Sequence, residues 1–230
     1  MKSKALRMAF LHTIPVLTGY CFLGLSYGLL MHSAGFSVSV SVAMSLFVYA
    51  GSMQYASVPL LCAPFAPFSA LALALVVNAR HIFYGISMLN QYRACGKKAP
   101  YLIFALTDET FSVQISAKIP ADVRQDDFCF FTSLLDQCYW VTATLLGGLL
   151  GGMLTLNTQG IEFVMTALFV VIFTGQWMES KEHRPAIIGL GASVLCLLIF
   201  GASGFILPAM GLMIAVLLML RKPLDRGAGA

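Results

Sequence analysis

Charge is what this sequence has least of. Only 10% of its 230 residues are Asp, Glu, Lys or Arg, whereas 59% are hydrophobic and the mean hydropathy is +0.84. A soluble domain averages about 25% charged residues. The composition therefore excludes an ordinary soluble domain and predicts one polytopic, all-helical membrane domain over residues 1–230.

Catalytic and cofactor motifs are lacking as well. The sequence contains no HExxH, no GxSxG and no phosphate-binding loop. Its six cysteines include no CxxC pair, so we interpret them as small packing residues and predict no metal site and no cofactor. An enzyme is therefore not expected. The net charge of +4 comes from the termini and one loop, which indicates membrane orientation and no nucleic-acid partner.

The apolar runs predict about seven to eight transmembrane or re-entrant helices. The first follows a basic start and continues without a small-residue cleavage site, so we expect it to be retained and not removed as a signal peptide. Two segments, 36–62 and 101–116, carry polar residues in their middle, and whether they cross or re-enter stays open. The expected segments are 8–31, 36–62, 69–89, 101–116, 128–153, 161–177, 186–200 and 204–220.

The most informative stretch is 69–89, because Arg80 lies near its middle. An arginine there costs about 2.5–3.5 kcal/mol on insertion scales, so it indicates a functional site with a partner elsewhere in the chain. At 100° per residue, Arg80 shares a face with Tyr84, whereas Asn78 and His81 share a second face with Gly85. The alternatives are an arginine that reaches to the interface and a purely structural ion pair.

Asp108 and Glu109 are the natural partners for Arg80. They form the only acidic pair in an apolar neighbourhood and are flanked by Thr107 and Thr110. The alternative is a helix start, where carboxylates favour the positive end of the helix dipole.

A polar interruption also lies in segment 36–62, where Gly51, Ser52 and Gln54 occur within AGSMQYASVP. Such a break resembles the discontinuous helices of secondary transporters, whose freed backbone groups face a binding cavity. The alternative is hydrogen bonding by Ser52 and Gln54 to neighbouring helices.

A weak internal repeat supports the same class. Residues 44–55, MSLFVYAGSMQY, align with residues 166–177, TALFVVIFTGQW, so that Ser52 and Gln54 match Thr174 and Gln176. Repeated halves around a central site are common in secondary transporters. The candidate halves are 8–116 and 128–221.

Basic residues at both termini predict that both lie in the cytoplasm. Eight full crossings satisfy this prediction but place the basic loop with Arg93, Lys97 and Lys98 outside. That loop changes side if segment 36–62 or 101–116 re-enters, and the sequence does not decide between these topologies.

The stretches AGSMQYA, NARHIFYGIS, LTDETF and DQCYWVTATLLGG occur in this order and together resemble the AzlC/BrnF family, the large subunit of branched-chain amino acid exporters. The resemblance covers nearly the whole chain. It implies export of hydrophobic L-amino acids across the bacterial cytoplasmic (inner) membrane, and a small membrane partner of the AzlD/BrnE kind. The residues that match the family motifs are Gln54, Asn78, Arg80, His81, Tyr84, Asp108, Glu109 and Asp136.

The chemistry of these side chains agrees with an amino acid substrate. Arg80 can bind the carboxylate with two hydrogen bonds, and Asp108 with Gln54 can bind the ammonium. The expected substrate-binding residues are Arg80, Asn78, Gln54, Ser52, Tyr84, Asp108 and Gln176, and those expected for proton coupling are Glu109, His81 and Asp136.

Because no nucleotide motif is present, the remaining energy sources are the proton gradient and the sodium gradient, and the predicted mechanism is proton antiport. Alternatives are a transporter of another small solute class and a non-transporting membrane assembly subunit. The small-residue surfaces at Gly24/Gly28 and Gly147–Gly152 are expected to contact the partner, and a higher oligomer stays open.

Overall fold

The computed structural model describes residues 2–64, 66–153, 170, 173–174, 177–178, 183–201 and 205–220. These residues are helical or lie in turns, and they contain no strand, which agrees with the predicted all-helical class. The elements are α1 (Lys2–Ser33), α2 (Val38–Phe47), α3 (Gly51–Cys62), α4 (Pro67–Asn78), α5 (Arg80–Arg93), the 3-10 turn η1 (Gly96–Lys98), α6 (Ala99–Phe104), α7 (Asp108–Ser116), α8 (Gln125–Met153), α10 (Arg184–Phe200) and α11 (Ile206–Met219).

Three of the predicted segments are each divided into two helices. Segment 36–62 forms α2 and α3, segment 69–89 falls on α4 and α5, and segment 101–116 falls on α6 and α7. Among the described residues, α1 alone is long and apolar enough to cross a membrane by length and composition, and α2 and α10 are shorter apolar helices. The breaks explain why few uninterrupted spans are found, since they divide stretches that are long enough in sequence.

The chain forms two compact units, residues 1–165 and 166–230. In the second unit α10 packs on α11, and α10 ends at Gly201, whose φ of +71° favours glycine. The predicted substrate residue Gln176 and most of the second repeat copy lie outside the described residues. The site described below therefore belongs to the first unit.

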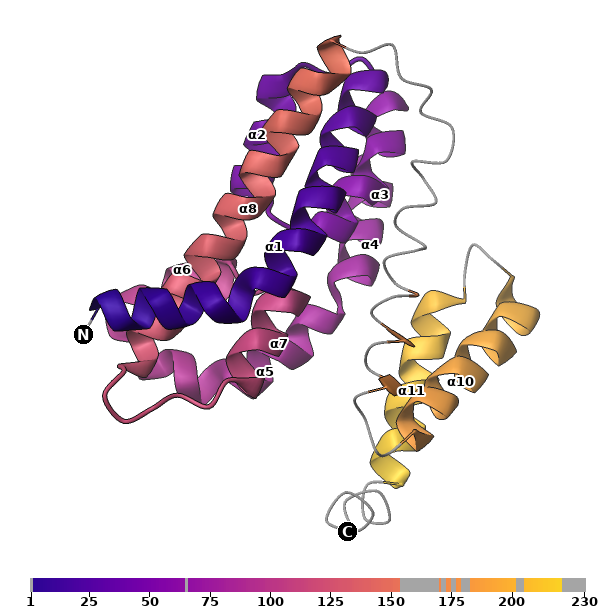
Figure 1. Ribbon diagram of the computed structural model, residues 1–230. Coiled ribbons are helices and arrows are strands. Elements are labelled where there is room, and N and C mark those ends of the chain that lie inside the picture. The colour runs from indigo at the N-terminus through magenta and orange to yellow at the C-terminus, as the bar shows by residue number, and fades with distance from the viewer. Residues whose placement is uncertain are drawn as a thin grey trace. The chain divides into compact units, whose positions relative to one another are not determined.

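The first unit is organised on α1 and α8, which lie side by side over much of their length (Figure 1). The two helices run parallel. A Cβ atom on Gly24 would lie 2.6 Å from the Cβ of Ala143, and one on Gly151 would lie 2.8 Å from the Cβ of His32. Both helices therefore begin at one end of the unit and finish at the other.

Glycine permits this close approach. A Cβ on Gly28 would meet the backbone of Thr144 and Gly148, and a Cβ on Gly147 would meet the carbonyl group of Leu25. The expectation that these surfaces contact a separate partner subunit is therefore wrong: they face each other within the chain. Small residues let helix backbones approach closely whether the two helices belong to one chain or to two.

The first hairpin, α2–α3, enters the unit from the end where α1 and α8 finish. Along α8, Val38 lies near Gly148, the Ser45 hydroxyl donates to Thr144 Oγ1 at 2.9 Å, and the Leu46 carbonyl accepts from Gln137 Nε2 at 3.2 Å. The chain then reverses, and α3 runs back beside α1, where the Tyr55 hydroxyl donates to the Leu23 carbonyl at 2.7 Å. The tip of this hairpin, residues 48–50, lies about halfway along the unit.

The second hairpin, α6–α7, enters from the opposite end. Lys98, just before α6, contacts Asp126 at the start of α8, whereas Phe104 at the end of α6 lies 6.2 Å from the Tyr49 ring. Helix α7 then runs back toward the start of α8. Thr110, near the beginning of α7, donates to Asp136, and Gln114, further along α7, donates to the Cys129 carbonyl nearer the start of α8. The tips of the two hairpins therefore meet inside the unit.

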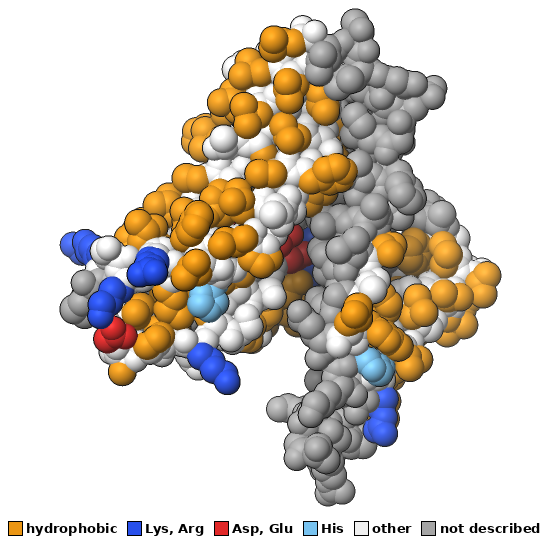
Figure 2. Space-filling model, in the orientation of Figure 1, with side chains coloured by type: hydrophobic (Ala, Val, Ile, Leu, Met, Phe, Trp, Pro, Cys, Tyr) orange, Lys and Arg blue, Asp and Glu red, His pale blue; other side chains and the backbone are white. Residues whose placement is uncertain are grey.

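Ion pairs gather where α1 and α8 begin, and we call this region the basic end. Lys4 lies 2.7 Å from Asp122, and Lys98 lies 2.9 Å from Asp126, which also pairs with Arg124. The hydrogen bond from Lys98 lowers the pKa of Asp126 to about 2, so its carboxylate stays charged. Figure 2 shows basic side chains gathered over this region and mostly hydrophobic side chains beyond it.

The N-terminal part of α1 bends away from the axis of its remainder (Figure 1). Pro15 lies inside the helix and cannot donate the backbone hydrogen bond that a helix interior requires. Pro15 therefore accounts for a bend within this helix.

The crossing of α1 and α8 yields a stability prediction. Gly147→Ala should lower the free energy of unfolding by about 1–3 kcal/mol, because the added methyl group meets backbone atoms of α1 that cannot rotate away. Thermal unfolding of the detergent-solubilised protein measures the effect. Gly19→Ala is the matched control, since nothing lies within 4 Å of its added Cβ. Equal stability of the two variants would contradict the packing described.

Candidate functional site

Three helix starts meet at Arg80. Its Nη2 atom donates to Ser52 Oγ at 2.7 Å and lies 3.0 Å from Asp108 Oδ2. Ser52 is in the first turn of α3, Arg80 is the first residue of α5, and Asp108 is the first residue of α7. Arg80 therefore links the broken segment α4–α5 to both hairpins.

The pairing predicted for Arg80 is confirmed, and its partner is Asp108. The two side chains are 31% and 22% exposed, so neither is fully withdrawn from the surroundings. The expected position within a helix needs correction: Arg80 does not lie inside one continuous helix but begins a new one, after Ala79. Ala79, between α4 and α5, keeps helical φ and ψ angles of −55° and −32°. The break therefore interrupts the backbone hydrogen bonding of the helix more than it changes the direction of the chain.

The acidic pair also occupies a helix start, as the alternative interpretation proposed. Thr107 is the N-cap of α7, and its side-chain oxygen accepts from the Thr110 amide at 3.2 Å. Asp108 and Glu109 follow in the first turn, where carboxylates interact favourably with the helix dipole. Both interpretations of the pair therefore hold together.

Gln54 has a different environment from the one expected. It is fully buried, its Nε2 donates to Ser45 Oγ at 3.1 Å, and its Oε1 accepts from Trp140 Nε1 at 2.9 Å. Ser45 in turn donates to Thr144. Gln54 therefore joins α3 to α2 and α8, as the interhelical alternative proposed, while Ser52 faces Arg80.

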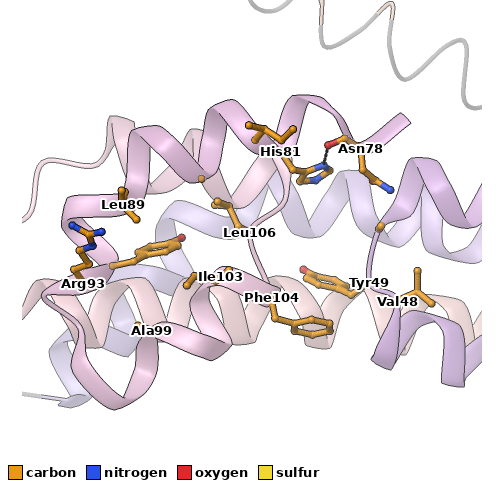
Figure 3. A pocket seen from close by; sticks show the side chains of 14 residues that line it. Val48, Tyr49, Asn78, His81, Leu89, Arg93, Ala99, Ile103, Phe104 and Leu106 are labelled. Atoms are coloured by element: carbon orange, nitrogen blue, oxygen red, sulfur yellow. Dashed lines mark hydrogen bonds between the residues drawn. The ribbon is translucent and has the colours of Figure 1, made fainter. Parts of the chain in front are cut away.

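The second polar face of α5 lines a cavity of about 540 Å³ (Figure 3). Asn78 and His81 lie at one end of the cavity, and Arg93 lies at the other. The wall between them is mostly apolar and is contributed by α5, α6 and the tip of the α2–α3 hairpin. Its members are Val48, Tyr49, Ala50, Ile82, Gly85, Leu89, Tyr92, Ala99, Ile103, Phe104 and Leu106.

The grouping of Asn78, His81 and Gly85 that helical spacing predicted is thus present in the cavity wall. His81 Nδ1 lies 3.2 Å from the Asn78 carbonyl oxygen, a hydrogen bond when that nitrogen carries the proton. On the first face, Tyr84 stacks on Phe111 with ring centroids 4.7 Å apart. Arg80 and Tyr84 therefore turn toward α7 while Asn78 and His81 turn toward the cavity.

A chain of hydroxyl groups joins the two remaining acids. Tyr20 Oη donates to Glu109 Oε2 at 2.8 Å and lies 3.0 Å from Thr107 Oγ1. Thr107 contacts Thr110 at 3.1 Å, and Thr110 donates to Asp136 Oδ2 at 2.8 Å. The expected proton-coupling residues Glu109 and Asp136 are therefore connected, whereas His81 lies in the cavity wall instead.

Two tyrosines of this region were not expected from the sequence. Tyr20 is 5% exposed and completes the hydroxyl chain, and Tyr49 is 4% exposed at the tip of the α2–α3 hairpin. Tyr49 has a φ of +43°, a conformation that residues other than glycine rarely adopt. Among the described residues its hydroxyl has no hydrogen-bond partner. Neither tyrosine carries a charge that would have marked it in an apolar sequence.

Metal binding finds no support in the described part of the chain, where no group of three or more His, Cys, Asp or Glu side chains could hold an ion. The chemistry available at the site is that of one guanidinium, three carboxyl groups, hydroxyls and helix amides. Such groups bind and orient charged solutes and exchange protons.

The fold and the site are those of a helical membrane protein with broken helices around a half-buried ion pair. Residues 15–154 match the family model described as AzlC protein. The chain is 50% identical over 222 residues to the branched-chain amino acid transport protein AzlC of Bacillus subtilis, covering 96% of this chain and 87% of that protein. The chain belongs to the AzlC family.

Other relatives are membrane proteins. One of Haemophilus influenzae is 42% identical over 209 residues, covering 90% of this chain and 86% of that protein. The inner membrane protein YgaZ of Escherichia coli is 26% identical over 192 residues, covering 79% and 78% of the two chains. No solved structure matches the chain. The resemblance stated from the sequence is confirmed, and the chain is a membrane protein.

The ion pair yields the next prediction. Arg80→Gln and Asp108→Asn should each lower the free energy of unfolding by about 1–3 kcal/mol, because each leaves a charged partner in a poorly solvated place. The double variant should recover part of that loss, with a coupling of about 0.5–3 kcal/mol. Thermal unfolding of the four proteins forms the cycle. Strict additivity of the two single effects would show that the two side chains do not stabilise each other.

Proposed function

We propose that this protein is a secondary active transporter that exports branched-chain or other hydrophobic L-amino acids from the bacterial cytoplasm by proton antiport. Support for the substrate class comes from the relative of Bacillus subtilis, which is named as a branched-chain amino acid transport protein. The observation that carries the proposal at this site is the junction of three helix starts at Arg80.

The junction suits a carboxylate ligand. Arg80 presents a planar fork that matches a carboxylate, and the starts of α3, α5 and α7 contribute partly positive backbone amides. Asp108 now occupies this guanidinium, so an incoming carboxylate competes with Asp108 and releases it toward the substrate ammonium. Ser52 contacts Arg80, Tyr84 lies on the same face of α5, and Asn78 lies in the cavity wall; all three are proposed to supply further polar contacts to the substrate. Gln54 is removed from the proposed binding set because its amide is already used by Ser45 and Trp140.

The cavity provides the apolar part of the proposed path. It extends along α5 from Arg93 at the basic end to Asn78 and His81, which adjoin Arg80, and the tip at Val48–Ala50 closes its inner end. Apolar walls with a few polar groups are typical of small-molecule sites. A branched side chain can lie in this cavity while the carboxylate of the same substrate reaches Arg80.

Export against a gradient needs an energy source, and the sequence has no nucleotide motif to supply one. Glu109 and Asp136 are the proposed proton carriers, since each is a carboxyl group in the interior that accepts a hydrogen bond from a hydroxyl group. His81 in the cavity wall is a further group that can change protonation near neutral pH.

The ion pairs of the basic end favour one topology. Asp122 and Asp126 are four residues apart, at most about 14 Å of chain, whereas the hydrocarbon layer is about 30 Å thick. Lys4 and Lys98, which pair with them, therefore share one side of the membrane. In our proposal that side is the cytoplasm, because the basic residues concentrate there, and the basic C-terminus lies on the same side.

In the first unit, α1, α4 together with α5, and α8 are then the crossing segments, while the two hairpins re-enter from opposite sides. Helices α4 and α5 contain 12 and 14 residues, together about 40 Å of helix, which is enough to cross. Broken helices at membrane depth are tolerated where they line a cavity, as the two tips do here. The candidate repeat halves 8–116 and 128–221 remain part of the proposal.

A small partner of the AzlD/BrnE kind is proposed from the family resemblance. Its contact surface does not include Gly24, Gly28 or Gly147, because these glycines pack within the chain.

Transport in proteoliposomes tests the function. Radiolabelled L-valine, L-isoleucine or L-leucine should cross the membrane when a pH gradient is imposed. Comparing the flux with and without the small partner tests whether the partner is required. Arg80→Ala should reduce flux by about 100-fold or more, and Arg80→Lys should restore little of it, because a bidentate carboxylate contact is worth several kcal/mol and lysine lacks the fork.

Arg124→Ala is the matched control, since Arg124 is an exposed arginine paired at the basic end. Normal flux by a well-folded Arg80→Ala protein would refute the role of Arg80. Flux by the unaltered protein that ignores the pH gradient would refute proton antiport.

The topology has its own test in cysteine-labelling experiments on intact cells. With re-entrant hairpins, the native Cys62 at the end of α3 should react with an impermeant thiol reagent, whereas Lys97→Cys should react only after permeabilisation. Each thiol is placed alone in a background without other cysteines. Full crossing by segments 36–62 and 101–116 gives the reverse labelling pattern, so the two topologies are distinguished by one measurement.

A further inference from the structure

Asp136 is the most enclosed acid of the first unit. Its side chain is 0% exposed, it lies in the middle of α8, and one of its oxygens, Oδ1, has no hydrogen-bond partner among the described residues. Within that described part, no ion pair to Lys, Arg or His involves Asp136. Burial with so few partners disfavours the charged carboxylate relative to the neutral acid. The protonation of Asp136 therefore depends on the groups that surround it.

The other oxygen of the Asp136 side chain, Oδ2, accepts a hydrogen bond from the Thr110 hydroxyl at 2.8 Å. From Thr110 the contacts continue to Thr107 at 3.1 Å, to Tyr20 at 3.0 Å and to Glu109 at 2.8 Å. Glu109 is partly exposed, whereas Asp136 is not. The hydroxyls therefore connect an enclosed acid to one nearer the site at Arg80.

We propose that Tyr20, Thr107 and Thr110 form a proton relay between Glu109 and Asp136. The inference rests on the proposed proton coupling and names the route within it. One proton is shared by the two carboxyl groups. When Glu109 holds it, Glu109 donates to Tyr20, Tyr20 to Thr107, Thr107 to Thr110 and Thr110 to Asp136.

Transfer shifts each hydroxyl proton to the next oxygen, so that Glu109 becomes a carboxylate, Asp136 becomes the acid and every hydroxyl is restored. In the reverse arrangement every donation is turned round and Tyr20 donates to Glu109. The structure shows this direction at Tyr20 and the forward direction at Thr107 and Thr110. Each hydroxyl can donate one bond and accept others, so both directions of the chain are complete. No co-reactant is needed beyond the one proton.

Arg80 is the cation that contacts α7, the helix that carries most of the relay. Asp108 lies beside Glu109 on α7 and is paired with Arg80, so it separates that positive charge from the chain. The other titratable groups that interact with the two acids are tyrosines from the surrounding elements: Tyr20 on α1, Tyr49 at the hairpin tip, Tyr84 on α5, Tyr101 on α6 and Tyr139 on α8. Exchange of Arg80 between Asp108 and a substrate carboxylate therefore changes the charge next to Glu109.

The relay is tested by removing one hydroxyl at a time. Tyr20→Phe and Thr110→Val keep the size of the side chain and interrupt the chain at different points. In proteoliposomes that carry L-leucine, both should lose proton movement by about tenfold or more, the scale of a positioned proton-transfer group. Exchange of labelled for unlabelled L-leucine without a pH gradient should continue.

The controls separate a relay from a structural role. Tyr139→Phe removes a tyrosine hydroxyl that joins α8 to α1, through Thr13 at 3.2 Å, but lies outside the relay. Thr110→Ser restores a hydroxyl and should recover most of the proton movement lost in Thr110→Val. Equal loss in Tyr139→Phe, no recovery in Thr110→Ser, or parallel loss of exchange and proton movement would overturn the relay.

A second measurement does not depend on transport. The infrared carboxyl band that disappears in Asp136→Asn identifies the Asp136 acid, and its hydrogen–deuterium exchange reports access of protons to it. That exchange should slow by about tenfold or more in Tyr20→Phe. An unchanged exchange rate would overturn the relay even if transport is proton-coupled. Slowed exchange in a protein whose L-leucine flux ignores the pH gradient would support the relay and refute the proposed antiport.

Discussion

The contact of Arg80 with Ser52 and Asp108 is the interaction on which the middle of the first unit depends. One guanidinium joins the starts of α3, α5 and α7, three helices that belong to different parts of the chain. A charge in a poorly solvated place interacts strongly with its partners and is costly without them. The two hairpin tips are therefore held where they are by a pair that a charged ligand can replace.

Broken helices make such a junction possible. A continuous membrane helix satisfies its own backbone groups, whereas each break leaves amides at a helix start that need another partner. At α7 the side chain of Thr107 supplies one partner. The backbone amides at the other helix starts lie near the cavity or near Arg80, where polar groups of the site surround them. The close crossing of α1 and α8, which glycine permits, gives the breaks a rigid support.

The sequence predicted the ion pair because charges are scarce in this chain: an arginine in an apolar run has few acids to choose from, and Asp108 was one of two candidates. It did not decide between the two interpretations of Gln54, since a neutral amide serves a helix contact or a ligand equally well. It also misassigned the glycines at Gly28 and Gly147, because close packing looks the same within a chain as between chains. Tyr20 and Tyr49 carried no charge to mark them.

One turn of α7 ties these features together. Consecutive residues on a helix point about 100° apart, so Asp108 faces Arg80 while Glu109 reaches Tyr20, and Thr107 and Thr110 carry the contact on to Asp136. These four neighbours belong to one short stretch of backbone, so the Arg80 pair and the hydroxyl contacts share the same support. In the proposed antiport, this single helical turn is the element that links the ligand site at Arg80 to the two proton carriers.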